Sequence, residues 1–293
     1  MIIGKPSVEP VDRQQEISDI VSGISSSRRN VNYALLGHRR IGKTTILWRV
    51  RQELSELGFN VVYLDLSVYK LTPVEFAQAV MSQITENYAK DLGRVDKATV
   101  TISNLLRTLL KLRKLRFTLE PTVDERGQFS VAMRPELVET EDLPKVLALA
   151  FDYANEVSKK SKRRVVIMID EFPTIVEFTR YPKLGNILER FRSILENRAN
   201  VCYVVSGSRV HFMRGIFGSG DSPLFGHFVV REVKELAEND AMELYTKVSN
   251  ASAAEARSAY AIVGGHPYYL IMLAENRRPE EKIDQTYRRI LTS

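Results

Sequence analysis

A glycine-rich stretch near the N-terminus constrains this chain more than any other feature. Residues 37–44 read GHRRIGKT, which matches the pattern G-x-x-x-x-G-K-[ST] in full. An apolar run of strand type, 32–36, precedes the stretch, and residues 45–57 carry apolar side chains at helical spacing. The sequence therefore predicts a strand, a tight loop and a helix in that order, which is the geometry of a phosphate-binding loop.

Each residue type in this loop has a physical reason for its position. Gly37 and Gly42 let backbone N–H groups point inward, with no Cβ in the way of a phosphate. The first turn of the following helix attracts anions through its unpaired amides and its dipole. Lys43 supplies a cation for the β- and γ-phosphates, and Thr44 supplies a hydroxyl for Mg²⁺. The other residues predicted to bind the nucleotide are His38, Arg39, Arg40, Ile41 and Thr45.

A second stretch with a predicted chemical role lies further along the chain. Residues 164–172 read RVVIMIDEF, an apolar run that ends in Asp170 and Glu171. Ligands of open α/β sheets bind at the carboxyl ends of the strands, so both acids are expected at the ligand edge. We predict that Asp170 holds Mg²⁺ together with Thr44. Glu171 is predicted to orient and deprotonate an attacking water.

A further apolar run, 200–208 with the sequence NVCYVVSGS, ends in small polar residues. From the edge of a sheet, Ser206, Ser208 or Arg209 can reach toward a γ-phosphate. An ordinary turn at the end of a strand explains the same residues equally well, so both interpretations stay open. Cys202, the only cysteine, lies in this run, and its apolar neighbours indicate a buried thiol in a reducing compartment.

The order of the predicted elements indicates an α/β fold, with a parallel sheet covered by helices on both faces. We expect residues 1–236 to form a P-loop nucleotide-binding domain. An insertion at about 91–139 interrupts the alternation with a leucine-rich helical stretch and a short β-hairpin. Beyond residue 236 the pattern is helical, so 237–293 is expected to form a small lid domain. Helices are predicted there at 239–248, 252–263, 267–274 and 280–291.

Composition excludes several other classes of protein. A chain of 293 residues with 44% hydrophobic residues can bury a large core. Its apolar runs are all far shorter than the ~20 residues of a membrane span. The start of the chain lacks the apolar segment of a signal peptide. We therefore expect a cytoplasmic protein with no membrane partner. The four histidines show no metal-ligand spacing.

The motifs together resemble the archaeal-type ATPase family of the STAND class of P-loop NTPases, which is related to AAA+ proteins and NB-ARC domains. The resemblance covers essentially the whole chain, and it implies ATP or ADP and Mg²⁺ as ligands, ATP hydrolysis, and a nucleotide-dependent conformational switch. Members commonly continue into a winged-helix-like domain, so we expect either a short member or a truncated one. The segments that carry the resemblance are GHRRIGKT at 37–44, IMIDEF at 167–172, SGSR at 206–209, SPLFG at 222–226 and GGHPYYL at 264–270.

The resemblance also implies roles outside the two main motifs. Pro267 would pack beside the adenine and couple the lid to the nucleotide state. Arg13, in an R-x-x-E arrangement with Glu16, would lie near the base. Arg209 falls where NB-ARC proteins place an arginine that senses the γ-phosphate. At His227 the sequence departs from the arginine expected after SPLFG.

Partners other than the nucleotide are suggested only by charge. The formal net charge is +6, and cations cluster at 107–116 and 159–164. The clusters motivate an alternative function, a DNA-associated ATPase that resembles an initiator or loader. Solvated helix faces and cations at a helix C-terminus explain the same clusters. A protein partner and a nucleotide-dependent oligomer are further alternatives. A small-molecule phosphotransferase is less favoured, because we find no acceptor motif.

Overall fold

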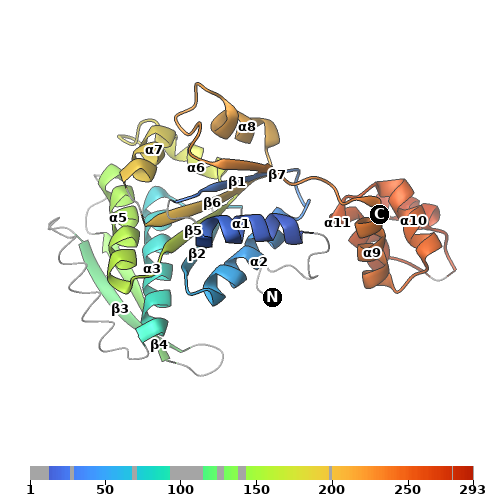
Figure 1. The fold of residues 1–293 in the computed structure, drawn as a ribbon, viewed down its shortest axis with the longest axis horizontal. Coiled ribbons are helices and arrows are strands. Elements are labelled where there is room, and N and C mark those ends of the chain that lie inside the picture. The colour runs from blue at the N-terminus through green and yellow to red at the C-terminus, as the bar shows by residue number, and fades with distance from the viewer. Residues whose placement is uncertain are drawn as a thin grey trace.

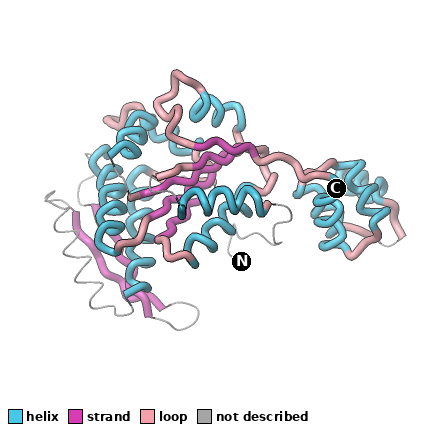
Figure 2. Tube along the Cα trace, in the orientation of Figure 1, coloured by secondary structure: helices cyan, strands magenta, loops and turns pink. Residues whose placement is uncertain are grey.

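The structure, a computed structural model, contains a parallel sheet with helices on both faces, followed by a cluster of short helices (Figure 1). An extended segment, 233–237, joins the two parts (Figure 2). No helix in the described part of the chain is long and apolar enough to cross a lipid bilayer. The structure describes residues 13–26, 30–67, 71–92, 115–123, 129–137, 143–197, 200–278 and 280–292.

Five parallel strands form the sheet, in the spatial order β2-β5-β6-β1-β7. This confirms the predicted parallel α/β fold and adds the strand order, which the sequence analysis did not predict. The register pairs Leu36 with Gly207 and Asp65 with Asp170, so neighbouring strands end at one common edge. The strands are β1 (Tyr33–Leu36), β2 (Asn60–Asp65), β5 (Val165–Asp170), β6 (Val201–Gly207) and β7 (Val229–Glu232).

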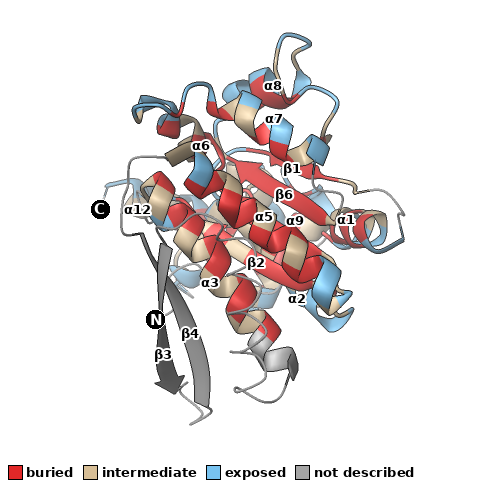
Figure 3. Ribbon diagram, turned by 90° about the vertical axis from the view of Figure 1, so that its left-hand side faces the viewer, coloured by how far each residue is buried: buried red, intermediate tan, exposed pale blue. Residues whose placement is uncertain are grey.

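Helices cover both faces of the sheet because its strands are apolar on both sides. Tyr33 and Leu35 of β1 pack toward α1 and α2, whereas Ala34 and Leu36 pack toward α3, α5 and α7. Figure 3 shows the central strands buried between these layers. The helices are α1 (Gln14–Ser26), α2 (Lys43–Glu56), α3 (Pro73–Leu92), α5 (Leu143–Ser161) and α7 (Ile187–Asn197).

Side chains of α3 form hydrogen bonds with backbone groups on the edge of β2 that faces away from β5. Gln83 accepts a hydrogen bond from the Tyr63 N–H at 3.0 Å and donates one to the Tyr63 carbonyl at 2.9 Å. Asn87 donates to the Val61 carbonyl at 2.9 Å. These bonds replace the ladder that a sixth strand would supply, so this edge is closed to further pairing.

The insertion contains the predicted hairpin, with longer strands than expected. Antiparallel β3 (Leu115–Val123) and β4 (Phe129–Leu137) form a sheet of their own. Residues 102–114 of the predicted leucine-rich helix lie outside the described residues, as do the cations at 107–114.

Two helices escaped the sequence analysis. One is α7, although Ile187, Phe191 and Ile194 recur at helical spacing and are buried. The other is α8 (Val210–Gly218), which follows β6. A short turn of helix, α6 (Pro173–Val176), and a 3₁₀ turn, η1 (Glu177–Arg180), also precede α7.

The C-terminal helices pack around an apolar cluster of their own, which begins at Leu236. Ser252 is the N-cap of α10, since the Glu255 N–H donates to Ser252 Oγ at 3.3 Å. The Glu255 carboxylate accepts hydrogen bonds from Tyr245 at 3.0 Å and Arg277 at 2.9 Å, so it ties α9 and α10 to the segment that follows α11. The helices are α9 (Glu238–Ser249), α10 (Ala253–Val263), α11 (Pro267–Glu275) and α12 (Ile283–Thr292).

Candidate active site

The predicted phosphate loop, residues 37–42, joins the carboxyl end of β1 to the first turn of α2. Its backbone is left-handed at Arg40, with φ 63°, and at Gly42, with φ 107°. Gly42 is the N-cap of α2, so the first amides of that helix have no intrahelical acceptor and face the loop. A Cβ on Gly37 would lie 2.7 Å from the Val233 carbonyl oxygen. Glycine at 37 therefore lets the loop pack against the segment that leaves β7.

Lys43 is the first residue of α2, and only 5% of its surface is exposed. Its Nζ donates to the carbonyl oxygens of Gly37 and His38, each at 2.9 Å. Burial lowers the pKa of Lys43, and the carboxylates of Glu171 and Asp170 oppose that shift. An ammonium group has three N–H donors, and these two carbonyls use two of them. The remaining donor and the buried charge fit a phosphate oxygen.

Asp170, the last residue of β5, is 4% exposed and collects side chains from neighbouring elements. Thr44 Oγ1, from α2, donates to Asp170 Oδ2 at 2.6 Å. Ser206 Oγ, from β6, donates to Asp170 Oδ1. Strand β6 lies between β1 and β5, so the phosphate loop and the acid are two strands apart at one edge of the sheet. The structure thus brings together Thr44, Asp170 and Ser206, which the sequence analysis had placed on three separate elements.

Glu171 follows directly and has a left-handed backbone, with φ 57°. Such a conformation costs a non-glycine residue about 1–3 kcal/mol and persists only where surrounding contacts impose it. Here the Glu171 N–H donates to Asp170 Oδ1 at 3.2 Å, and its Oε2 accepts from the Ser208 N–H at 3.2 Å. The chain therefore turns after Asp170, and both acids stay at the ligand edge despite the alternation of strand side chains.

The donor set fits Mg²⁺ bound together with a nucleotide. Thr44 and Asp170 present oxygen atoms, the ligands that Mg²⁺ prefers. Within the described residues, no group of three or more His, Cys, Asp or Glu side chains could hold a metal ion unaided. Mg²⁺ in nucleotide sites commonly takes one or two protein ligands and completes its shell with water and phosphate oxygens. Thr44 and Asp170 would supply the one or two protein ligands that such a site needs.

Tyr63 is a residue of this site that the sequence analysis missed. Its hydroxyl donates to Asp170 Oδ2 at 3.1 Å. Tyr63 lies on β2, and β2 pairs with β5 in register so that Asp65 is opposite Asp170. The sequence shows β2 as an apolar run but does not reveal its neighbour in the sheet. The contact could be predicted only from the order of the strands in the sheet.

The C-terminal helices contact the phosphate loop through the segment around Pro267. The Arg40 guanidinium carbon lies 4.0 Å from the ring centre of Tyr268. Burial lowers the pKa of His266, and a hydrogen bond with the Arg39 backbone partly opposes that shift. Pro267 stands between these two contacts as the first residue of α11.

Arg13 connects three parts of the molecule and is 6% exposed. Its guanidinium donates to Glu16 Oε1 at 3.1 Å, which is the pairing within the R-x-x-E arrangement. It also donates to the Ile41 carbonyl of the phosphate loop at 3.4 Å and to the Lys234 carbonyl at 2.7 Å. Arg13 therefore joins α1, the loop and the segment that leads to the C-terminal helices.

Arg209 and His227 lie apart from the cluster around Asp170. Arg209 is exposed, and its guanidinium carbon is 4.9 Å from the ring centre of Phe212 in the first turn of α8. His227 Nε2 lies 3.8 Å from the Glu196 carboxylate. The structure therefore places neither side chain against the phosphate loop.

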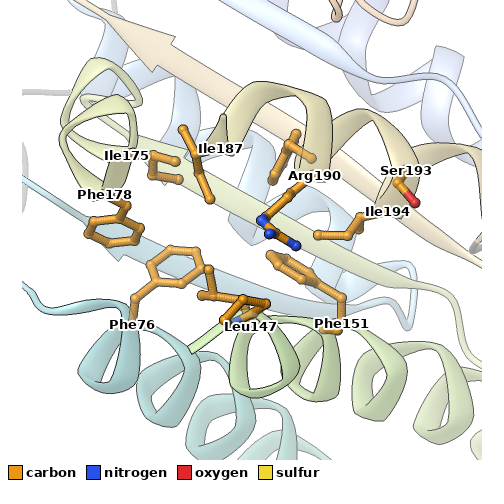
Figure 4. Close-up of a pocket in the computed structure, with 12 residues that line it drawn as sticks. Phe76, Leu147, Phe151, Ile175, Phe178, Ile187, Arg190, Ser193 and Ile194 are labelled. Atoms are coloured by element: carbon orange, nitrogen blue, oxygen red, sulfur yellow. The ribbon is translucent and has the colours of Figure 1, made fainter. Parts of the chain in front are cut away.

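An apolar cavity of about 150 Å³ opens elsewhere, between α3, α5 and α7 (Figure 4). Its walls belong to the main core, and Arg190 at its side donates to the Lys183 carbonyl at 3.3 Å. None of the lining residues is a predicted site residue. They are Phe76, Pro144, Leu147, Ala148, Phe151, Ile175, Phe178, Ile187, Arg190, Phe191, Ser193 and Ile194.

Comparison with solved structures finds the same fold in other proteins. A Walker-type ATPase of Pyrococcus abyssi has a TM-score of 0.59 and 16% identity, over 97% of this chain and 72% of that one. A STAND protein with a tetratricopeptide repeat sensor from Pyrococcus horikoshii has a TM-score of 0.51 and 15% identity, over 100% of this chain and 34% of that one. The ORC1 protein of Aeropyrum pernix, in complex with DNA, has a TM-score of 0.51 and 15% identity, over 97% and 66%.

These identities are low, so the solved structures establish the shared fold alone. No curated protein sequence matches the chain. The profile of a family described as an ATPase domain predominantly from Archaea matches residues 11–273, most of the chain. That match includes the phosphate loop, both acids and the segment around Pro267. This chain belongs to that ATPase family, as its sequence motifs predicted.

Proposed function

We propose that this protein binds MgATP at the carboxyl edge of its sheet, hydrolyses it with water, and uses the nucleotide state to switch the position of its helical lid. The observation that carries the proposal is the cluster of Lys43, Thr44, Asp170 and Glu171 at one edge. Thr44 and Asp170 are in direct contact at 2.6 Å, although they come from distant parts of the chain.

Binding rests on the phosphate loop and the first turn of α2. Backbone amides of residues 37–42 and Lys43 Nζ would hold the β- and γ-phosphates. Thr44 and Asp170 would hold Mg²⁺, which offsets the negative charge of the phosphates when it is bound. Because Lys43 is buried against its own loop, its charge is already positioned before the ligand arrives.

Chemistry rests on Glu171 as the general base. Its carboxylate accepts from the Ser208 N–H, lies one residue beyond Asp170, and would orient and deprotonate the attacking water. Ser206 would hold Asp170 in place, as its hydrogen bond to Oδ1 supports. Arg209 would reach the γ-phosphate from the N-terminus of α8 after its side chain leaves Phe212.

The switch rests on contacts between the nucleotide-binding domain, 1–236, and the lid domain, 237–293. Pro267 and Arg13 would lie near the adenine, and Arg13 already bonds both the loop and Lys234. A change in the loop can thus reach the lid through Arg13 and through the Arg40–Tyr268 contact. In this proposal the lid movement, not the chemistry, limits turnover.

DNA association is the second candidate function, because a solved structure with the same fold is an ORC1 protein in complex with DNA. The cations at 159–164 give it little support. Arg164 donates to the Ile24 carbonyl at 2.6 Å, and Lys159 pairs with Glu156 at 2.6 Å. Those at 107–114 lie outside the described residues. We therefore rank DNA binding below a switch that acts on a protein partner or on oligomerisation in the cytoplasm.

One experiment tests the proposal and separates the alternatives. Phosphate release from ATP is measured with no added acceptor, in Mg²⁺ and in EDTA, alongside molecular mass with ADP and with ATP. Release that requires Mg²⁺ supports a hydrolase and disfavours a phosphotransferase. Repeating both measurements with duplex DNA over a range of salt concentrations tests DNA association, which should weaken steeply with salt. Absence of release under all conditions contradicts the proposed function.

A further inference from the structure

The Asp170 carboxylate accepts four hydrogen bonds, two on each oxygen. Oδ1 accepts from Ser206 Oγ and from the Glu171 N–H, and Oδ2 accepts from Thr44 Oγ1 and Tyr63 OH. These donors approach both oxygens and together hold the rotation of the carboxylate. Three of the four donors belong to the phosphate loop helix or to the edge formed by β5 and β6. The fourth, Tyr63, comes from the far side of β5.

The Tyr63 side chain is held firmly enough to act as a fixed donor. Its ring centre lies 5.3 Å from that of Trp48, and the Arg51 guanidinium carbon lies 5.0 Å from the Trp48 ring and 5.9 Å from the Tyr63 ring. Its backbone N–H and carbonyl are both bonded to Gln83. The hydroxyl is therefore delivered to Asp170 by a residue fixed at its backbone and at its ring.

The chemistry of Tyr63 suits a donor and not a base. A phenol is an O–H donor, and Tyr63 OH donates its hydrogen bond to Asp170 Oδ2 at 3.1 Å. Its bond reaches the same oxygen that Thr44 contacts, so it acts where the two predicted metal ligands meet.

We infer that Tyr63 is a positioning residue for magnesium binding, whose hydroxyl holds the Asp170 carboxylate in the orientation that lets Asp170 and Thr44 serve one ion. The inference rests on the proposed function, because it requires Asp170 to hold Mg²⁺. In this role Tyr63 would act through Asp170, without contacting the metal or the nucleotide. Removing its hydroxyl should therefore change the response to Mg²⁺ and leave metal-free nucleotide binding intact.

The test is a Mg²⁺ titration of the binding of a fluorescent ATP analogue to the full chain. Tyr63→Phe deletes only the hydroxyl and keeps the ring packed against Trp48. We expect the Mg²⁺ concentration at half-saturation to rise about three- to tenfold, the effect of one lost hydrogen bond. Affinity in EDTA should equal that of the wild type. Trp48→Phe keeps the hydroxyl but loosens the ring, and should give a smaller rise.

Tyr33→Phe is the matched control. The Tyr33 hydroxyl also donates at 3.1 Å, but to the Asp19 carbonyl, and Tyr33 is the first residue of β1, at the opposite end of the strand from the site. This variant loses a comparable bond and should keep the wild-type Mg²⁺ midpoint. A shift of equal size in Tyr33→Phe would overturn the inference, because it would show a general loss of stability.

The outcomes also distinguish this inference from the proposed function. If wild-type binding does not respond to Mg²⁺, or if Asp170→Asn responds like the wild type, the proposed function is wrong and the inference falls with it. If both behave as proposed and Tyr63→Phe keeps the wild-type midpoint, only the inference is overturned. A fall in EDTA affinity that matches the change in Mg²⁺ would likewise overturn it, since the role would then be structural.

Discussion

Arg40 of the phosphate loop stacks on Tyr268 of the lid, with its guanidinium carbon 4.0 Å from the ring centre. Arg40 has a left-handed backbone, φ 63°, and Tyr268 directly follows Pro267 at the start of α11. A cation over an aromatic face is attracted by the ring quadrupole. The contact joins the two parts of the molecule at the place where we propose that phosphate binds, so in the proposed switch it would couple the nucleotide to the C-terminal helices.

Tyr268→Leu should weaken ATP binding by about two- to fivefold. A partly exposed cation–π contact contributes about 0.5–1 kcal/mol, and its loss would loosen the lid over the nucleotide. The measurement is a titration with a fluorescent ATP analogue. Phe225→Leu is the control, because it removes an exposed ring outside the C-terminal helices. Equal losses in both variants would show that the Arg40 contact is not responsible.

Gly265→Ala should dislodge the segment that leads into α11. A Cβ at this position would lie 1.9 Å from the Leu236 carbonyl oxygen. The two residues are also hydrogen-bonded, since the Leu236 N–H donates to the Gly265 carbonyl at 2.9 Å. Overpacking of this kind destabilises by about 1–3 kcal/mol or more. A thermal melt should show a lower midpoint. Gly215→Ala, in a helix and with open space around it, should be neutral or slightly stabilising.

Stability should fall on acidification through His266. Burial lowers its pKa, and the Arg39 backbone and Glu235 only partly offset the shift. The unfolded chain takes up this proton near pH ~6.5. The neutral, partly buried imidazole therefore favours folding above that pH, and the advantage is lost as the pH falls through the lower folded pKa.

Denaturant unfolding at about pH 7.5 and about pH 5.5 checks the sign of this effect. Between these two pH values, the free energy of unfolding should fall by more in the wild type than in His266→Gln. His211→Gln, at an exposed position of α8, is the control and should follow the wild type. A His266→Gln variant with the full wild-type loss would contradict the assignment.

Local patterns in the sequence predicted the phosphate loop and the acid pair, because each motif includes the elements on either side of it. Gly42, Lys43 and Thr44 follow a strand and open a helix, and Asp170 ends an apolar run. Helix caps also act locally, since Thr72 and Ser252 each accept a hydrogen bond from the N–H three residues further on, at Glu75 and Glu255.

What escaped prediction depends on which elements meet in space. Tyr63 contacts Asp170 only because β2 neighbours β5, and Arg40 contacts Tyr268 only because the C-terminal helices lie against the phosphate loop. Arg164 sits in a charged run of a kind that is usually solvated, yet it donates to the Ile24 carbonyl. The helix α7 is a different case, because the helical spacing of its apolar residues is visible in the sequence.

Lys43→Ala should lower ATP affinity about ten- to a hundredfold. A charge-assisted hydrogen bond contributes about 1.5–3 kcal/mol, and Lys43 also ties the Gly37 and His38 carbonyls together. Isothermal titration with ATP gives the affinity. Lys247→Ala removes an exposed lysine from the last turn of α9 and should change nothing. Wild-type affinity in Lys43→Ala would show that this ammonium does not face phosphate.

The adjacent acids allow binding and chemistry to be separated. Glu171→Gln keeps the size of the side chain and an oxygen to accept from the Ser208 N–H, but removes the base. General-base catalysis contributes about 10²–10⁴-fold, so phosphate release should fall by that factor while MgATP still binds. Asp170→Asn should instead weaken Mg²⁺-dependent binding as well as turnover, because it alters the partner of Thr44.

Affinity for MgATP and the rate of phosphate release should therefore be measured for both variants in parallel. The left-handed backbone of Glu171 aids the comparison, because the turn places the two carboxylates at one edge while different neighbours hold them. If Glu171→Gln released phosphate at nearly the wild-type rate, the base would have to lie elsewhere. Loss of binding in Glu171→Gln equal to that in Asp170→Asn would show that the two acids act as one metal site and not as ligand and base.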